Sequence, residues 1–273
     1  MDFETKFSNI VHENNSLLCV GLDIDIDRMP SFLLKTKKEP LFEFNKKIID
    51  ATKDLVCAYK LNMAFYEVFG IKGYDLLEKT VRYIPKKIVI ILDGKRNDIG
   101  NTARKYAKMF YDKLKADAVT INPYLGLDGV KPFLEYKDKC GFILCRTSNT
   151  SAVDFQDFKT SDGKPLYEHV ADKIKEWNKI GYCGAVVGAT YPDELKKIRK
   201  ILGDDIPLLI PGVGKQGGDV EKTVKYGVNK QGVNAIINSS RGIIFAGEDK
   251  NFAKNSRKKA IFLREKINEF RYC

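Results

Sequence analysis

Eight short apolar runs recur along the chain at fairly regular intervals. They span residues 17–23, 56–62, 87–95, 118–124, 141–148, 183–190, 206–213 and 234–241. Each run is nearly continuous in apolar and often β-branched residues, which is typical of parallel strands covered on both faces. Amphipathic segments lie between the runs, for example at 39–55, 101–114 and 165–180. Strand and helix alternating in this way predict a (β/α)₈ barrel, with an open doubly wound sheet as the alternative.

No linker or low-complexity stretch divides the 273 residues, so we expect one catalytic domain over residues 1–273. The segment 253–270 places Ala260, Leu263, Ile267 and Phe270 at spacings of three and four, which predicts a helix that packs on one face. The longest connection, 149–165, is polar and contains Gly and Pro. We expect it to form a surface loop before a helix.

The net charge of +11 at pH 7 raises the question of a nucleic-acid partner. The lysines, however, are interleaved with acidic residues in helix-like segments such as 193–200. We therefore expect solvated helix faces and no nucleic-acid partner. No apolar stretch reaches the roughly 18–20 residues of a membrane span, and the first residues do not resemble a signal peptide, so we expect no membrane partner. With two histidines and no C-x-x-C pair among six cysteines, we expect no zinc site and reduced cysteines in a cytoplasmic protein.

Polar residues concentrate at the carboxyl ends of the predicted strands, where barrel enzymes place their active sites. The strand-end residues are Asp23, Lys60 with Asn62, Asp93 with Lys95, Arg146 to Asn149, a glycine loop after strand seven, and Ser239 to Arg241. Polar groups gathered on one rim of an otherwise apolar barrel indicate an enzyme.

The third strand ends in opposite charges. Because side chains alternate along a strand, Asp93 and Lys95 share a face, while Gly94 and Arg96 point the other way. Lys60, two residues before Asn62, ends the neighbouring strand, so two lysines and an aspartate can converge at the rim. The alternative is a structural ion-pair network. Buried ion pairs are weak stabilisers, which favours a catalytic cluster.

The segment 211–219 contains a G-x-G-x-x-G pattern at Gly212, Gly214 and Gly217. A dinucleotide site would need an acidic residue at the end of the next strand, and the run 232–240 has none. A glycine loop after strand seven, together with Arg241 after strand eight, instead matches the phosphate site common in these barrels. Backbone N–H groups without a neighbouring Cβ can approach a phosphate, and arginine binds it through two N–H groups. Ordinary turns are the alternative.

The segment "LDGKRNDIGNT", residues 92–102, resembles the D-x-K-x-x-D-I-x-x-T signature of the orotidine 5′-monophosphate decarboxylase family. "YKLN" (59–62), "PGVGKQGGD" (211–219) and "SSRGI" (239–243) resemble the other site segments of that family, at the right strands and in the right order. The resemblance spans essentially the whole chain, and "RTSN" (146–149) and "VGAT" (187–190) are similar to the branch with larger subunits. It implies cofactor-free decarboxylation of orotidine 5′-monophosphate to uridine 5′-monophosphate in a cytoplasmic homodimer.

The same resemblance implies roles for individual residues. Lys60, Asp93, Lys95 and Asp98 would form an alternating charged quartet, in which Asp98 and Thr102 cross the dimer interface into the neighbouring site. Asp93 would lie beside the substrate carboxylate, and Lys95 would deliver the proton to C6. Asp23, Lys60 and Thr102 would hold the ribose hydroxyls, with Asn62 nearby, and Thr147 or Ser148 would contact the pyrimidine. Gln216, next to Gly217, would bridge base and phosphate, and Arg241, next to Ser240, would bind the phosphate.

The elementary chemistry agrees with those roles. Loss of CO₂ from C6 leaves a carbanion, which fixed charges can stabilise. Asp93 between two lysines is expected to stay ionised, because opposite charges lower a carboxyl pKa. The competing hypothesis is a metal-dependent sugar-phosphate decarboxylase or aldolase of the same barrel suite. It would need acidic ligands at other strand ends, whereas strands four and six end in "NPY" (122–124) and "GAT" (188–190).

Overall fold

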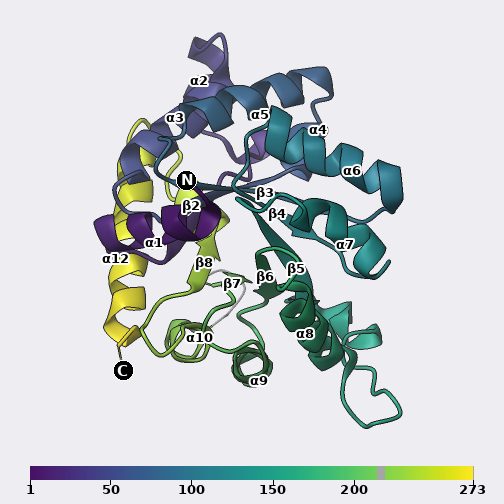
Figure 1. Ribbon diagram of the computed structural model, residues 1–273. Coiled ribbons are helices and arrows are strands. Elements are labelled where there is room, and N and C mark those ends of the chain that lie inside the picture. The colour runs from purple at the N-terminus through teal and green to yellow at the C-terminus, as the bar shows by residue number, and fades with distance from the viewer. Residues whose placement is uncertain (214–218, 273) are drawn as a thin grey trace.

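The computed structural model describes residues 1–213 and 219–272. Its eight parallel strands pair in sequence order, and β8 pairs with β1, so the sheet closes into a barrel (Figure 1). The strands are β1 (Leu18–Gly21), β2 (Ala58–Asn62), β3 (Val89–Arg96), β4 (Ala118–Ile121), β5 (Cys140–Arg146), β6 (Cys183–Val187), β7 (Leu208–Pro211) and β8 (Ala235–Ser239).

Helices occupy the connections and surround the strands (Figure 1). The α-helices are α1 (Phe3–Glu13), α2 (Ser31–Thr36), α3 (Pro40–Thr52), α4 (Ala64–Glu67), α5 (Ile71–Tyr83), α6 (Gly100–Lys108), α7 (Leu127–Leu134), α8 (Leu166–Trp177), α9 (Pro192–Leu202), α10 (Val220–Gly227), α11 (Arg241–Ile244) and α12 (Phe252–Phe270). The described residues also form the 3₁₀ helices η1 (Ile26–Arg28) and η3 (Thr150–Asp154) and a π-helical turn, η2 (Met109–Lys113).

The predicted barrel is confirmed, and the open sheet is wrong, because β1 has a paired strand on each side. Each predicted run overlaps one observed strand, with ends that differ by up to three residues. The predicted loop at 149–165 is more ordered than expected, since it contains η3 and an antiparallel bridge between Lys159 and Pro165. The predicted last helix is confirmed as α12, with Ala260, Leu263 and Ile267 on its buried face.

The barrel interior and the layer between sheet and helices form the core. Every residue of β4 and β6 is buried, as expected of strands covered on both faces. Gly184 in β6 illustrates how tightly the layers pack, because a Cβ there would lie 2.4 Å from the ring of Phe142. Only glycine allows that approach.

The first helix lies across the ends at which β4, β5 and β6 begin. Lys6 Nζ lies 2.6 Å from Asp117 Oδ2, just before β4, and the ring of Phe3 packs edge-on against Phe142 of β5. The backbone N–H of Phe3 also donates to the carbonyl of Asp138. α1 therefore covers the amino-terminal end of this part of the barrel.

Strand β3 departs from regular geometry near its carboxyl end. Leu92 pairs with Val119 and Arg96 with Ile121, so β3 advances four residues while β4 advances two. Such a bulge re-aims the side chains next to it. Lys95, inside the bulge, has φ +46°, a left-handed conformation that is uncommon for a residue other than glycine.

None of the described helices is both long and apolar enough to cross a lipid bilayer. Five cysteines in the described part of the chain, Cys19, Cys57, Cys140, Cys145 and Cys183, are buried free thiols.

Candidate active site

The carboxyl ends of the strands surround a cavity of about 450 Å³. The predicted site residues that line it are Asp23, Lys60, Asn62, Asp93, Lys95, Thr147, Ser148, Ser240 and Arg241. The sequence-based expectation that the strand ends form one polar rim is therefore confirmed. The volume of the cavity lies within the range of small-molecule binding sites.

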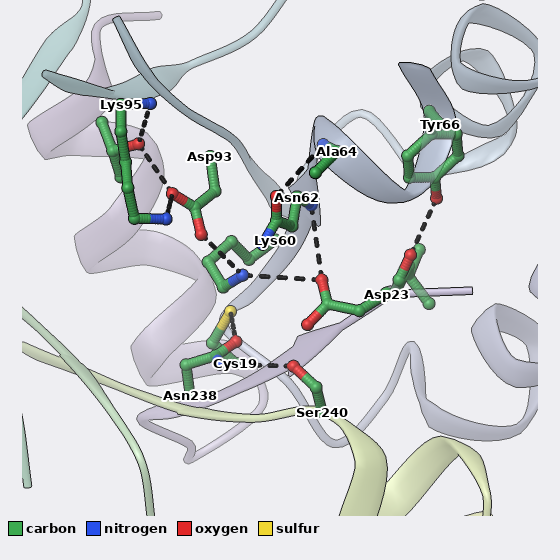
Figure 2. A network of polar contacts seen from close by, with 12 residues as sticks. Cys19, Asp23, Lys60, Asn62, Ala64, Tyr66, Asp93, Lys95, Asn238 and Ser240 are labelled. Atoms are coloured by element: carbon green, nitrogen blue, oxygen red, sulfur yellow. Dashed lines mark hydrogen bonds and ion pairs between the residues drawn. The ribbon is translucent and has the colours of Figure 1, made fainter. Parts of the chain in front are cut away.

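Charged side chains form a continuous array on the β1 to β3 side of the cavity, as Figure 2 shows. Lys60 Nζ lies 3.1 Å from Asp93 Oδ2 and 3.6 Å from Asp23 Oδ1. Lys95 Nζ lies 2.6 Å from Asp93 Oδ1. The convergence of two lysines on one aspartate, predicted from strand alternation, is therefore confirmed.

Burial and the neighbouring charges shift the pKa of Asp93, which is 8% exposed, in opposite directions. Burial alone would raise the pKa of this carboxyl, but the charges of Lys60 and Lys95 hold the pKa below its usual range. Burial would likewise lower the pKa of Lys60, yet the carboxylates of Asp23 and Asp93 hold that pKa above its usual value. Asp93 and Lys60 therefore both stay charged at neutral pH, as the sequence predicted for Asp93.

Thr120 of β4 also belongs to the array. Its hydroxyl donates to Asp93 Oδ1 over 2.8 Å and accepts the backbone N–H of Lys95 over 3.0 Å. Sequence reasoning missed this residue, because a threonine in the apolar run 118–124 fits an ordinary β-branched strand position.

Asp23 follows β1, and Asn62 ends β2. The backbone N–H of Asn62 donates to Asp23 Oδ1 at 3.4 Å, so the two strand ends are linked beside Lys60 (Figure 2). The side-chain oxygen of Asn62 accepts the N–H of Ala64 at 3.2 Å, which orients its amide at the start of α4.

The end of β8 contributes neutral polar groups. The thiol of Cys19 donates to Asn238 Oδ1 at 3.4 Å, and Asn238 Nδ2 donates to Ser240 Oγ at 3.4 Å. Gly21 makes room for this hydroxyl, because a Cβ at Gly21 would lie 1.9 Å from Ser240 Oγ. Asn238 lines the cavity and was not predicted, since it lies inside an apolar run.

The loop after β5 is fixed by several side chains. Gln156 Nε2 donates to Thr147 Oγ1 over 2.8 Å, and Gln156 Oε1 accepts the N–H of Thr147 over 2.8 Å. Fully buried Arg146 donates to the carbonyl of Thr147 over 2.8 Å and stacks 3.9 Å from the ring centre of Tyr191. Gln156 lines the cavity from a position nine residues after Thr147, which no local pattern in the sequence indicated.

Arg241 begins the short helix α11 and is exposed at the cavity edge. Gly212, after β7, lines the same edge with φ +100°, a conformation that favours glycine. The predicted residues Gln216 and Gly217 lie outside the described residues.

Asp98 and Thr102 are not brought to the cavity of their own chain. Neither is among the described residues that line it. Asp98 Oδ1 accepts the N–H of Ile99 at 2.8 Å, and Thr102 is exposed on α6. Three members of the predicted quartet are therefore together, and a single chain does not test the fourth.

Within residues 1–213 and 219–272, no three His, Cys, Asp or Glu side chains are grouped so that they could hold a metal ion. The two acids that line the cavity, Asp23 and Asp93, both face Lys60. This donor set gives no support to the metal-dependent alternative.

The chain is similar to known proteins both in sequence and in structure. A model of the family described as "Orotidine 5'-phosphate decarboxylase / HUMPS family" matches residues 16–255. An orotidine 5′-phosphate decarboxylase of Dehalococcoides mccartyi (strain ATCC BAA-2100 / JCM 16839 / KCTC 5957 / BAV1) is 46% identical over 274 residues, which is 99% of each chain. One of Cellvibrio japonicus (strain Ueda107) is 47% identical over 273 residues, 98% of each chain.

Solved structures agree with these sequence relatives. The OMP decarboxylase of Leishmania donovani superposes with a TM-score of 0.87 at 35% identity and covers 100% of both chains. The orotidine 5'-monophosphate decarboxylase of Plasmodium berghei superposes with a TM-score of 0.84 at 27% identity, covering 98% of this chain and 99% of its own.

Proposed function

The chain belongs to the orotidine 5′-phosphate decarboxylase family, and from that membership we propose how its own residues carry the reaction. The reaction is the decarboxylation of orotidine 5′-monophosphate to uridine 5′-monophosphate. The observation that carries the proposal is the array of Lys60, Asp93 and Lys95 that lines the cavity, in which Lys60 and Asp93 are buried.

We propose that the substrate carboxylate binds next to Asp93. Two carboxylates about 3 Å apart repel by roughly 5 kcal/mol at an effective dielectric constant near 20. Lys60 and Lys95 offset part of this repulsion and keep Asp93 ionised, so the substrate carboxylate is the group that leaves as CO₂. Lys60, 4% exposed and held by Asp23 as well, is the fixed positive charge of the site.

Lys95 is proposed to stabilise the carbanion and to protonate it. Its ammonium faces Asp93 at 2.6 Å, while 46% of its side chain is exposed to the cavity and solvent. As the bond to CO₂ breaks, negative charge develops at C6, and a fixed ammonium lowers the energy of that state. Proton transfer from Lys95 Nζ to C6 leaves a neutral amine, which solvent can protonate again.

The remaining contacts are proposed from the positions of the cavity residues. Asp23 and Asn62 lie beside Lys60, where ribose hydroxyls can bind both carboxylate and amide oxygens. Thr147 or Ser148 is proposed to contact the pyrimidine, because both follow β5 and line the cavity. Arg241 is placed at the phosphate, since guanidinium groups bind phosphate through two N–H groups. Ser240 lies next to it, and Gln216 and Gly217 are proposed to complete this part of the site.

We further propose a homodimer in which Asp98 and Thr102 enter the site of the neighbouring subunit. The segments that follow β2, β3 and β4 expose large apolar residues, namely Val68, Ile71, Ile99, Tyr124 and Leu125. Apolar residues gathered on one face are typical of protein interfaces. Asp98 directly precedes Ile99 in the chain and Thr102 follows it on α6, so we place both at the proposed interface.

No cofactor is part of the proposal, and the buried free thiols support a reducing cytoplasmic setting. A Schiff-base mechanism is disfavoured, because the raised pKa keeps Lys60 charged and therefore a poor nucleophile.

The test is the fall in ultraviolet absorbance on adding orotidine 5′-monophosphate, with and without EDTA. Equal rates in both conditions are expected. Complete loss of activity in EDTA that a divalent metal restores would reject the cofactor-free mechanism and favour the sugar-phosphate alternative.

A further inference from the structure

Beyond the residues already assigned, we propose that Thr120 is a positioning residue that fixes both Asp93 and Lys95 for the reaction. This inference rests on the proposed function, since it concerns how the two proposed catalytic groups are held. It is carried by one hydroxyl that contacts both of them.

The direction of each hydrogen bond at Thr120 is determined by its partner. A backbone N–H can only donate, so the N–H of Lys95 donates to Thr120 Oγ1 over 3.0 Å. An ionised carboxylate can only accept, so the hydroxyl proton must point to Asp93 Oδ1 at 2.8 Å. The threonine is 1% exposed and β-branched, so its side chain has little freedom to turn away.

Asp93 needs this contact because its two oxygens have different surroundings. Oδ2 faces buried Lys60, whereas Oδ1 faces Lys95, whose side chain is 46% exposed. Without the hydroxyl, the position of Oδ1 would depend only on the half-exposed side chain of Lys95. Thr120 keeps the carboxylate in place when a second carboxylate approaches it.

Lys95 needs the same hydroxyl for a different reason. Its backbone lies in the left-handed region at φ +46°, which is unfavourable for a residue with a Cβ. The bulge between Leu92 and Arg96 places Thr120 beside the unpaired stretch of β3. In a regular parallel sheet, the N–H of Lys95 would donate its hydrogen bond to a carbonyl of the neighbouring strand. Here it donates to the hydroxyl of Thr120 instead. Loss of this bond would let the backbone relax and move Lys95 Nζ.

The test is Thr120→Val, which preserves the shape of the side chain and removes only the hydroxyl. We expect kcat to fall on the order of 100-fold, as for a reacting group displaced by about 1 Å, with little change in KM. Exchange of the C6 hydrogen of uridine 5′-monophosphate with D₂O reports the proposed proton transfer by Lys95 without decarboxylation, and it should slow in parallel. Thr120→Ser retains the hydroxyl and should recover most of kcat.

Thr223→Val is the matched control. Thr223 is also fully buried, lies on α10, and has a hydroxyl with no hydrogen-bond partner among the described residues. Its replacement should leave kcat and C6 exchange unchanged. If Thr120→Val does not fold, Thr120→Cys replaces it in the same assays, because a thiol is only a weak donor.

Two further variants separate this inference from the proposed function. Lys95→Ala and Asp93→Asn should each be nearly inactive. If they keep their activity, the proposed catalytic roles are wrong. The other outcome is that Lys95→Ala and Asp93→Asn are inactive while Thr120→Val keeps both kcat and the rate of C6 exchange within about threefold of the original protein. A threefold change is smaller than the tenfold change that corresponds to about 1.4 kcal/mol, and this result would show that Thr120 is not a positioning residue.

Discussion

Asp93→Asn tests whether charge, and not shape alone, holds the buried array together. The replacement has nearly the same size but only one acceptor oxygen. If that oxygen keeps the bonds from Lys95 and Thr120, the amide NH₂ group takes the place of Oδ2, 3.1 Å from Lys60 Nζ. Two donors then face each other, and Lys60 retains only Asp23 at 3.6 Å.

The size of the effect follows from those distances and from burial. At 3.1 Å the attraction between Lys60 and Asp93 is roughly 5 kcal/mol for an effective dielectric constant near 20. Removing one partner of a buried pair usually costs about 3–5 kcal/mol of the free energy of unfolding. Because Asp23 still compensates part of the lysine charge, we expect a loss near the lower limit, about 3 kcal/mol.

Guanidinium unfolding at one fixed protein concentration measures this loss, and the fixed concentration keeps the comparison valid for the proposed dimer, whose stability depends on concentration. Asp54→Asn is the matched control, because Asp54 pairs with Arg257 at 2.7 Å while both side chains are well exposed, at 55% and 39%. An exposed pair contributes about 1 kcal/mol or less. If Asp93→Asn destabilises the protein no more than Asp54→Asn does, the buried array does not depend on its charges.

Three other predictions concern the pH dependence, the phosphate and the interface. The pKa of the Asp93 carboxyl is lowered from 3.8 in the folded protein, so its ionised form stabilises the fold fully above that pH, and this stabilisation is lost as the pH falls. The difference in the free energy of unfolding between the original protein and Asp93→Asn should therefore be constant from about pH 5 to 8 and shrink below about pH 4, as measured by denaturation at a series of pH values. Arg241→Ala should weaken substrate binding by about 2–5 kcal/mol, and unchanged KM and kcat/KM would show that Arg241 does not hold the phosphate. Lys95→Ala mixed with Asp98→Ala should recover activity at about a quarter of the sites after subunit exchange, since half of the dimers pair unlike chains and each has one intact site. No recovery after verified exchange would place Asp98 outside the neighbouring site.

The barrel could be predicted because the strands are covered on both faces and therefore contain few polar residues. The convergence of Lys60, Asp93 and Lys95 followed from alternation along adjacent strands and needed no knowledge of distances. Asn238 and Thr120 could not be found in this way. They are polar residues inside apolar runs, and only the three-dimensional register shows that they face the cavity.

The role of Gln156 and the backbone conformation of Lys95 could not be predicted from the sequence for other reasons. Gln156 reaches Thr147 through a loop whose path depends on tertiary contacts, including those of buried Arg146. The left-handed backbone of Lys95 arises from a bulge between two strands, and the residues of β3 alone do not encode it.

The wall of the cavity is divided between two halves of the barrel. The lining acids and lysines, Asp23, Lys60, Asp93 and Lys95, lie on or just after β1 to β3, whereas Thr147, Ser148, Ser240 and Arg241 follow β5 and β8. In the proposed function, the bond to CO₂ breaks beside β1 to β3, which also hold the ribose, whereas the base and the phosphate are bound by residues that follow β5 and β8. Substitutions in the loop after β5 should therefore alter which base is accepted without dismantling the charged array, so a redesign for another pyrimidine carboxylate can begin from an assembled set of charges.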